Sequence, residues 1–206
     1  MGYSSPIIEV RKTEVFADWL DGFRDIRARA RILVRIERLA AGNPGDVKPV
    51  SEGVSELRID YGPGYRVYFK QQGRELVILL AGGDKKTQAS DIRPLFALLA
   101  TFRGNVMKKT NTSRYDVAEH LRTPEEMAAY LEACLEEANG DAAFVAKALG
   151  DIARAKGMSQ VARDSGLSRE SLYKALSGER TPGFDTILKV VSALGLKLHA
   201  EADRVS

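Results

Sequence analysis

One stretch of the second half, SQVARDSGLSRESLYKALSG (residues 159–178), has the pattern of two short helices joined by a tight turn. Ala162 is small where two helices must approach closely, and Gly166 can supply the turn between them. Ser168 is placed to cap the second helix. This spacing is typical of a helix-turn-helix that binds DNA.

The early turns of the second helix hold the side chains that would face DNA. Arg169 could reach a guanine edge, and Ser171 a base or a phosphate. Leu172 and Leu176 are expected to pack inward. The predicted DNA-binding set is Gln160, Ser168, Arg169, Glu170, Ser171, Tyr173 and Lys174.

The remainder of the second half is predicted to be helical. Thr123, followed by proline and two glutamates, is a strong start for a helix over residues 123–138. Asp141 is expected to cap the next helix, and a last helix is predicted over residues 184–194. Residues 196–198 could add a short terminal strand.

The first half alternates between helical and strand periodicity, which predicts an α+β domain with helices on a small, mostly antiparallel sheet. Helices are expected within residues 14–39, with a break near Gly22. Residues 41–53 read as a loop because they are rich in Gly, Asn, Pro and Asp. Strands are predicted over 6–11, 55–60, 65–71 and 74–81, and a further helix over 90–102.

The domain organisation follows from these patterns. Residues 103–112 (RGNVMKKTNT) have no apolar periodicity, so we expect a linker over residues 104–114 between domains at 1–103 and 115–206. The first domain is net basic and the second slightly acidic, which allows mutual attraction or a polyanionic partner for the first.

Composition excludes several classes of function. Cys134 is the only cysteine, so no internal disulfide can form, and a reducing cytoplasm suits the chain. With only His120 and His199 beside it, a zinc site is not expected. No apolar run is long enough to span a membrane, so we expect no membrane partner.

Basic and aromatic residues gather on the predicted strands of the first half. Alternation places Arg66, Tyr68 and Lys70 on one face of their strand. That face suits RNA, because guanidinium groups hold phosphates and a tyrosine can stack on a base. An exposed sheet face covered by long polar side chains is the alternative.

A second basic surface is predicted on the helices of the first half. At helical spacing, five arginines fall opposite the apolar stripe, and they are either a solvated helix surface or a phosphate-binding face. They are Arg24, Arg27, Arg31, Arg35 and Arg38.

Two runs of the first half, ELRIDYGPGYRVYF (residues 56–69) and VILLAGGDKKTQASDI (77–92), resemble the RelE/HigB-type toxins of addiction modules. The segments FADWLDGFRDIRARARI and AAGNPGD fit the same pattern. The second half, from YDVAEHLRTPEEMAAYLEACLEEANGD (115–141) through the helix-turn-helix, resembles the HigA-type antitoxin.

The resemblance implies a ribosome-dependent endoribonuclease in which a ribose 2′-hydroxyl attacks the adjacent phosphate, without a metal or another cofactor. Arg58, Arg66 and Lys85 match motif positions and would stabilise the phosphate. Tyr68 or Lys86 could relay the proton. Some members carry a tyrosine or histidine near the end of the domain, where this chain has Phe96 and Phe102.

The leading hypothesis is a cytoplasmic fused toxin–antitoxin protein. Its first half would be a latent enzyme acting on mRNA at the ribosome, and its second half would neutralise it within one chain or across a homodimer. The second half would also bind operator DNA and repress its own operon. One alternative is a transcription repressor with an inert RelE-like binding domain, and another is a general RNA-binding module joined to a helix-turn-helix.

Overall fold

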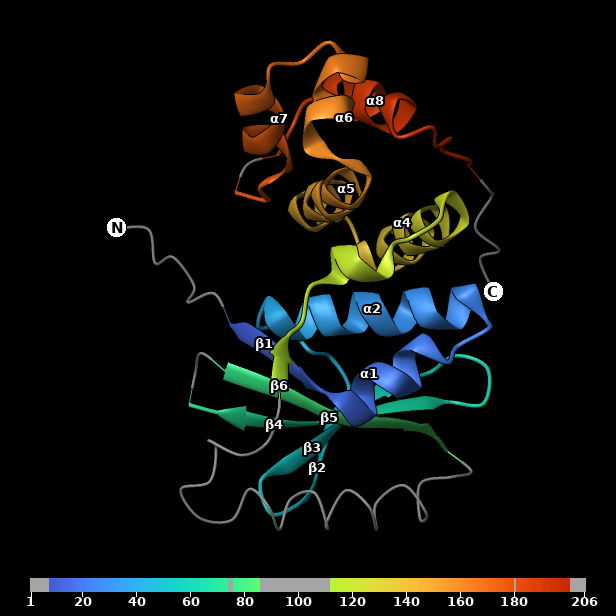
Figure 1. Cartoon of the computed structure of the whole chain (residues 1–206), viewed down its shortest axis with the longest axis vertical. Coiled ribbons are helices and arrows are strands. Elements are labelled where there is room, and N and C mark those ends of the chain that lie inside the picture. The colour runs from blue at the N-terminus through green and yellow to red at the C-terminus, as the bar shows by residue number, and fades with distance from the viewer. Residues whose placement is uncertain (1–7, 74–75, 86–111, 180, 201–206) are drawn as a thin grey trace. The chain divides into compact units, whose positions relative to one another are not determined.

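The computed structural model describes residues 8–73, 76–85, 112–179 and 181–200, and the chain divides into two compact units. The first unit is Met1–Asp116 and the second is Val117–Ser206. The first is α+β and the second is all helical among the described residues (Figure 1). The α+β and helical halves predicted from the sequence are confirmed. The helix predicted over residues 90–102 lies outside the described residues.

The first unit contains a six-stranded mixed sheet in the order β2-β3-β4-β5-β1-β6. Strand β1 lies parallel to β5, and the other described pairings are antiparallel. The sheet is thus mostly antiparallel, as predicted, and β1 is the exception because it is separated from β5 by enough chain to return in the same direction. The elements are β1 (Glu9–Thr13), α1 (Glu14–Asp21), α2 (Ile26–Ala40), β2 (Val47–Ser51), β3 (Val54–Ile59), β4 (Tyr65–Gln72), β5 (Leu76–Asp84) and β6 (Thr112–Arg114).

The two helices form because each has its own N-terminal cap. Thr13 accepts a hydrogen bond from the backbone N–H of Phe16 and donates one to the carbonyl of Leu80, so it caps α1 and ties it to β5. Asp25 caps α2 in the same way through the N–H groups of Arg27 and Ala28. The predicted break near Gly22 is confirmed.

Two strands were missed by the sequence patterns. Strand β2 lies within the predicted loop at 41–53, where Pro49 argues against a central strand but is tolerated at the sheet edge. Strand β6 has only three residues, and it pairs with β1 about one hundred positions earlier in the chain. Arg11 strengthens this pairing by donating hydrogen bonds to the hydroxyl and the carbonyl of Thr112.

Helices α1 and α2 lie together on one face of the sheet (Figure 1). Phe16 and Leu20 of α1 are fully buried there. Trp19 lies so close to Gly82 of β5 that a Cβ atom at Gly82 would sit 2.1 Å from the indole ring. Trp19 can pack at this position because Gly82 has no side chain.

The opposite face of the sheet has its own apolar cluster of buried residues, Val54, Tyr68, Ile78, Leu80 and Ala81. Alternation along β4 predicted Arg66, Tyr68 and Lys70 on one face. Tyr68, however, is fully buried in this cluster, so the phenol does not form part of an exposed cationic surface.

The second unit consists of helices whose starts follow the predicted caps. Thr123 and Glu126 form a reciprocal capping box, and Asp141 caps the next helix. The strand predicted over residues 196–198 does not form. The elements are η1 (Val117–His120), α4 (Pro124–Ala138), α5 (Ala142–Lys156), α6 (Met158–Ser165), α7 (Arg169–Leu176) and α8 (Phe184–Ala193).

A buried carboxylate holds α4 against α5. Asp151 accepts hydrogen bonds from Tyr130 at 3.2 Å, Lys147 at 3.2 Å and Arg154 at 2.8 Å. One residue earlier, Gly150 allows α7 to approach α5, because a Cβ atom there would lie 2.7 Å from the carbonyl oxygen of Leu176. These contacts fix the position of α7 within its unit.

None of the helices in the described parts of the chain is long and apolar enough to cross a membrane.

We predict that Gly82→Ala destabilises the first unit by about 1–3 kcal/mol, because the new methyl group must displace the Trp19 ring. Urea unfolding followed by the fluorescence of Trp19, the single tryptophan, measures this. Gly22→Ala is the control, since Gly22 has a helical φ of −72° and a methyl group added there would lie 3.3 Å from its nearest neighbour. Equal midpoints for the two variants would contradict the prediction.

Candidate functional site

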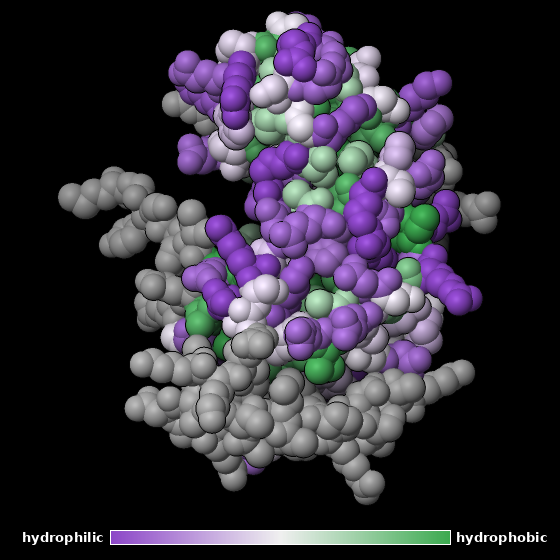
Figure 2. Space-filling model, in the orientation of Figure 1, coloured by the Kyte–Doolittle hydropathy of each residue, from purple (hydrophilic) through white to green (hydrophobic). Residues whose placement is uncertain are grey.

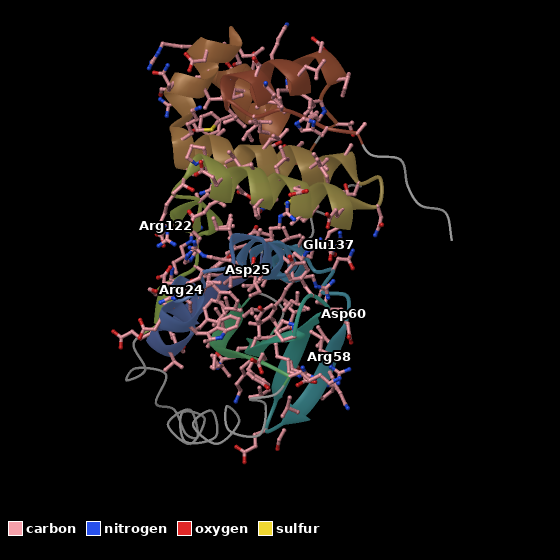
Figure 3. All side chains as sticks on the ribbon, turned by 90° about the vertical axis from the view of Figure 1, so that its right-hand side faces the viewer. Arg24, Asp25, Arg58, Asp60, Arg122 and Glu137 are labelled. Carbon is pink, nitrogen blue, oxygen red and sulfur yellow. The ribbon has the colours of Figure 1, made fainter. Side chains whose placement is uncertain are left out.

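Two arginines and a glutamate lie together on β3 and β4 of the first unit. Arg58 of β3 is directly opposite Arg66 of β4 in the antiparallel register. Glu56 lies two residues before Arg58, so alternation puts its side chain on the same face. Figure 3 labels Arg58 on these strands.

Glu56 contacts both arginines. Its Oε1 atom accepts a hydrogen bond from Nε of Arg58 at 2.8 Å, and its Oε2 atom lies 3.3 Å from Nε of Arg66. The exposed fractions of the side chains are 2% for Glu56, 11% for Arg66 and 34% for Arg58. The hydrogen bond with Glu56 raises the pKa of Arg58 further above its usual range, despite an opposing effect of burial.

Lys85 follows directly after β5, on the side of the strand that alternation gives to Arg66. Arg66 is opposite Gly83 in the register, and the backbone N–H of Lys85 bonds to the carbonyl of Gly64. Lys85 is exposed. The structure thus brings Arg58, Arg66 and Lys85 to one end of one sheet face, whereas Lys86 lies outside the described residues.

Tyr68 is on the same face but does not reach the surface. It is opposite Ala81 in β5 and is fully buried among apolar side chains. The burial favours a packing role for this phenol. Its predicted role in proton transfer stays a prediction.

Tyr65, the residue next to Arg66, faces the other side of the sheet. Its ring meets Phe23 edge-on at 5.1 Å between centroids. Burial, followed by the charges of Asp25 and Asp84, raises the pKa of Tyr65, because both effects disfavour the phenolate. Tyr65 is therefore held as a neutral phenol on the face of the sheet opposite to Arg66.

The arginines predicted to share one helix face have different surroundings. Arg31 stacks over the ring of Tyr61 at 4.7 Å, and Arg35 donates a hydrogen bond to the carbonyl of Pro44 at 2.7 Å. These two side chains hold neighbouring loops. Arg24 and Arg27 are exposed, and Figure 3 labels Arg24 near the start of α2.

In the second unit, α6 and α7 are joined by a tight turn. Gly166 ends α6 with a left-handed φ of 68°, and the N–H of Leu167 bonds back to the carbonyl of Ala162. Ser168 then caps α7 by accepting a hydrogen bond from the N–H of Ser171 at 3.0 Å. The two helices and their turn were therefore predictable from residues 159–178.

The predicted DNA-facing side chains of α6 and α7 share one property, which is that all are exposed. They are Gln160, Ser168, Arg169, Glu170, Ser171, Tyr173 and Lys174. Leu172 and Leu176 are buried, as expected. Arg169 lies over the ring of Tyr173 at 5.6 Å, and hydrophilic side chains cover α7 at the upper left of Figure 2.

An apolar groove of about 370 Å³ lies between α4, α5 and α8 of the second unit. Its walls include the exposed side chains Leu135, Phe184 and Leu198. Within the described parts of the chain, no three His, Cys, Asp or Glu side chains gather as metal ligands would.

Two family comparisons match separate parts of the chain. Residues 111–202 match the family described as "Probable addiction module antidote protein". Residues 18–95 match the family described as "Phage derived protein Gp49-like", which is toxin-like. These two matches support a toxin–antitoxin system. Below, Met1–Asp116 is called the Gp49-like unit and Val117–Ser206 the antidote unit.

Two relatives in Haemophilus influenzae are each named only as an uncharacterized protein. One is 54% identical over 86 residues, which is 42% of this chain and 87% of the relative. The other is 52% identical over 90 residues, which is 44% of this chain and 91% of the relative. Each relative thus corresponds to less than half of this chain. No solved structure matches.

Glu56 of the Gp49-like unit was given no role by the sequence analysis. It stands in the quoted run ELRIDYGPGYRVYF, where a glutamate two residues before an arginine reads as a surface ion pair. The signal that could have identified it is the combination of that spacing with Arg66 on the opposite strand.

We predict that Ser168→Ala lowers the stability of the antidote unit by about 1 kcal/mol, because the N–H of Ser171 loses its acceptor. Amide hydrogen exchange at Ser171 measures the effect locally and should become faster. Ser168→Asp restores a capping oxygen, so in this variant the amide of Ser171 should exchange at the rate of the original chain. If the alanine variant exchanged no faster than the aspartate variant, the cap would not hold α7.

Proposed function

We propose that the chain is a fused toxin–antitoxin protein. Its Gp49-like unit is a RelE/HigB-type endoribonuclease that cleaves mRNA on the ribosome and is kept latent by a HigA-type antitoxin. The observation that carries the proposal is that a toxin-like family and an antidote family match successive parts of one chain. In this proposal the toxin domain is the unit Met1–Asp116, which includes β6 and its pairing with β1.

The cationic cluster supports RNA cleavage. Arg58, Arg66 and Lys85 lie at one end of a sheet face, where they can hold a phosphate as the 2′-hydroxyl attacks it. Their positive charge stabilises the negative charge that develops on the phosphate oxygens. Tyr68 or Lys86 relays the proton in this proposal, and the burial of Tyr68 favours Lys86.

Toxin–antitoxin families imply contact between the two parts, within one chain or between chains. Covalent linkage places the antidote unit at an effective concentration on the order of 1 mM near its target. If the contact forms between chains instead, a homodimer results. In both cases the neutralised state needs no second gene product.

The antidote unit also represses its own operon through α6 and α7. In this proposal α7 enters the major groove of operator DNA, with Arg169 at a base edge and Gln160 and Lys174 at phosphates. The exposure of these residues and the burial of Leu172 and Leu176 support this orientation.

A second candidate function is a transcription repressor whose Gp49-like unit is catalytically inert. Two observations favour it: Glu56 contacts both arginines, and Tyr68 is buried. In such a protein the Gp49-like unit would serve only as a binding domain. The activity test below separates the two candidates.

We predict that the Gp49-like unit cleaves ribosome-bound mRNA once separated from its antidote. A specific protease site placed between Asp116 and Val117 allows the folded chain to be cut, and the two units to be separated. In a translation extract, the released unit should cleave mRNA, and Arg66→Ala should lower the rate by about 100-fold or more because a phosphate ligand is lost.

The control variant is Arg24→Ala, which removes an exposed arginine outside the cluster. It should cleave like the original chain. A folded, released unit that leaves mRNA intact would contradict the enzyme proposal and favour the inert repressor.

We predict that Arg169→Ala and Lys174→Ala weaken binding to DNA from the region upstream of the chain's own gene. Loss of Lys174 should lower the dependence of log K on log salt by about one unit, because one phosphate contact disappears. Loss of Arg169 should also lower the difference in binding free energy between the correct base and a wrong one by about 1–3 kcal/mol. Fluorescence anisotropy at several salt concentrations measures both.

Lys189→Ala in α8 is the matched control, since Lys189 is exposed and paired with Asp185. Its affinity should equal that of the original chain. If all three variants bound DNA equally well, α7 would not be the recognition helix.

A further inference from the structure

The carboxylate of Glu56 is divided between two guanidinium groups. One oxygen accepts a hydrogen bond from Arg58 and the other contacts Arg66, so each arginine is held by its own oxygen. Glu56 is almost completely buried, which removes it from the screening of solvent. Its contacts with the two arginines are therefore stronger than those of a surface ion pair.

The register of β3 and β4 explains why a carboxylate is needed between the two arginines. Arg58 and Arg66 are directly opposite each other on neighbouring antiparallel strands, where like charges repel. Arg66 is only 11% exposed, so water cannot offset this repulsion fully. A negative charge between the two groups holds them side by side.

We propose that Glu56 is the positioning residue of the phosphate-binding site, holding Arg58 and Arg66 in place for the RNA phosphate. This inference rests on the proposed function, because the phosphate is the one to be cleaved. Glu56 contacts each arginine at its Nε atom. A guanidinium group that is held at its Nε atom still has its Nη atoms to donate to a phosphate.

Glu56 also sets the charge of the site. Arg58, Arg66, Lys85 and Glu56 together carry a net charge of about +2, of which a phosphodiester of charge about −1 neutralises half. Without the glutamate charge the same site carries about +3, so it attracts anions more strongly but no longer holds the guanidinium groups in one orientation. Binding and catalysis should therefore change in opposite directions.

The test is Glu56→Gln in the full chain, which keeps the size of the side chain and removes its charge. Inorganic phosphate, titrated by calorimetry, should bind the variant about threefold to tenfold more tightly. Asp46→Asn is the matched control, because Asp46 is 4.0 Å from Arg58 and its side chain is 64% exposed. Solvent screens Asp46, so its loss should change the affinity less than twofold.

A second measurement observes the two arginine side chains directly. In the full chain, the Nε–H signals of Arg58 and Arg66 in ¹⁵N NMR, assigned with Arg58→Lys and Arg66→Lys, should both shift on addition of phosphate. The Arg58 signal should exchange slowly with water, and in Glu56→Gln it should exchange about tenfold faster because the charged acceptor is gone.

A third measurement follows cleavage by the unit released at the protease site. Glu56→Gln should lower kcat by about tenfold while KM falls or stays unchanged, because orientation is lost but attraction is gained. A residue that served only the stability of the sheet would not produce this split.

The outcomes separate this inference from the proposed function. If phosphate shifts neither arginine signal, or if Glu56→Gln binds phosphate no more tightly than Asp46→Asn, the positioning role is wrong. Equal kcat values for the original and Glu56→Gln units would overturn it as well. If the original unit cleaves no RNA but the phosphate and NMR results are as expected, the proposed function fails and the positioning of the arginines stands.

Discussion

The register of β3, β4 and β5 is the constraint on which the Gp49-like unit depends. Alternation along β4 puts Tyr68 and Arg66 on the same face of the sheet. Tyr68 lies in an apolar cluster, whereas Arg66, two residues earlier, lies at the charged end of that face. A shift of one residue would exchange the two faces of the strand, burying charge and exposing the core. The same pairing that stabilises the sheet therefore also assembles its cationic site.

The antidote unit depends on different constraints, which act between helices. Asp151 of α5 links its helix to α4 through Tyr130 and is also bonded by Lys147 and Arg154 of α5, and Gly150 allows α7 to lie against α5. Loss of one donor would leave a buried carboxylate partly satisfied, which costs more than a surface ion pair contributes. The orientation of α7 is thus set by buried groups that no DNA-binding motif would include.

Local patterns predicted most of the elements. The side chains of the caps Thr123, Asp141 and Ser168 accept hydrogen bonds from backbone groups no more than three residues away. Their roles could therefore be predicted from the local sequence. The break at Gly22 and the alternation in β4 are equally local. The sequence alone did not indicate β6, because three polar residues form a strand only when a distant partner, β1, is present.

The candidate site was predictable in part for the same reason. Arg58, Arg66 and Lys85 were identified by resemblance to a family, and the register brings them to one end of a face. Periodicity placed Tyr68 on that face correctly but could not show that the face is apolar at its centre. Glu56 was missed because its contact with Arg66 depends on which strand lies beside β3, and the local sequence does not give this. Strand β6, whose partner was equally distant, also matters during synthesis of the chain: the described sheet of the Gp49-like unit gains this strand only after Arg114 has been synthesised, and the 90 residues from Val117 to Ser206 follow at once. At typical rates of translation, ~5–20 residues per second, these residues are made within ~5–20 s. In the proposed toxin–antitoxin protein the two parts are therefore made in equal numbers, and the Gp49-like unit could act alone only within that interval.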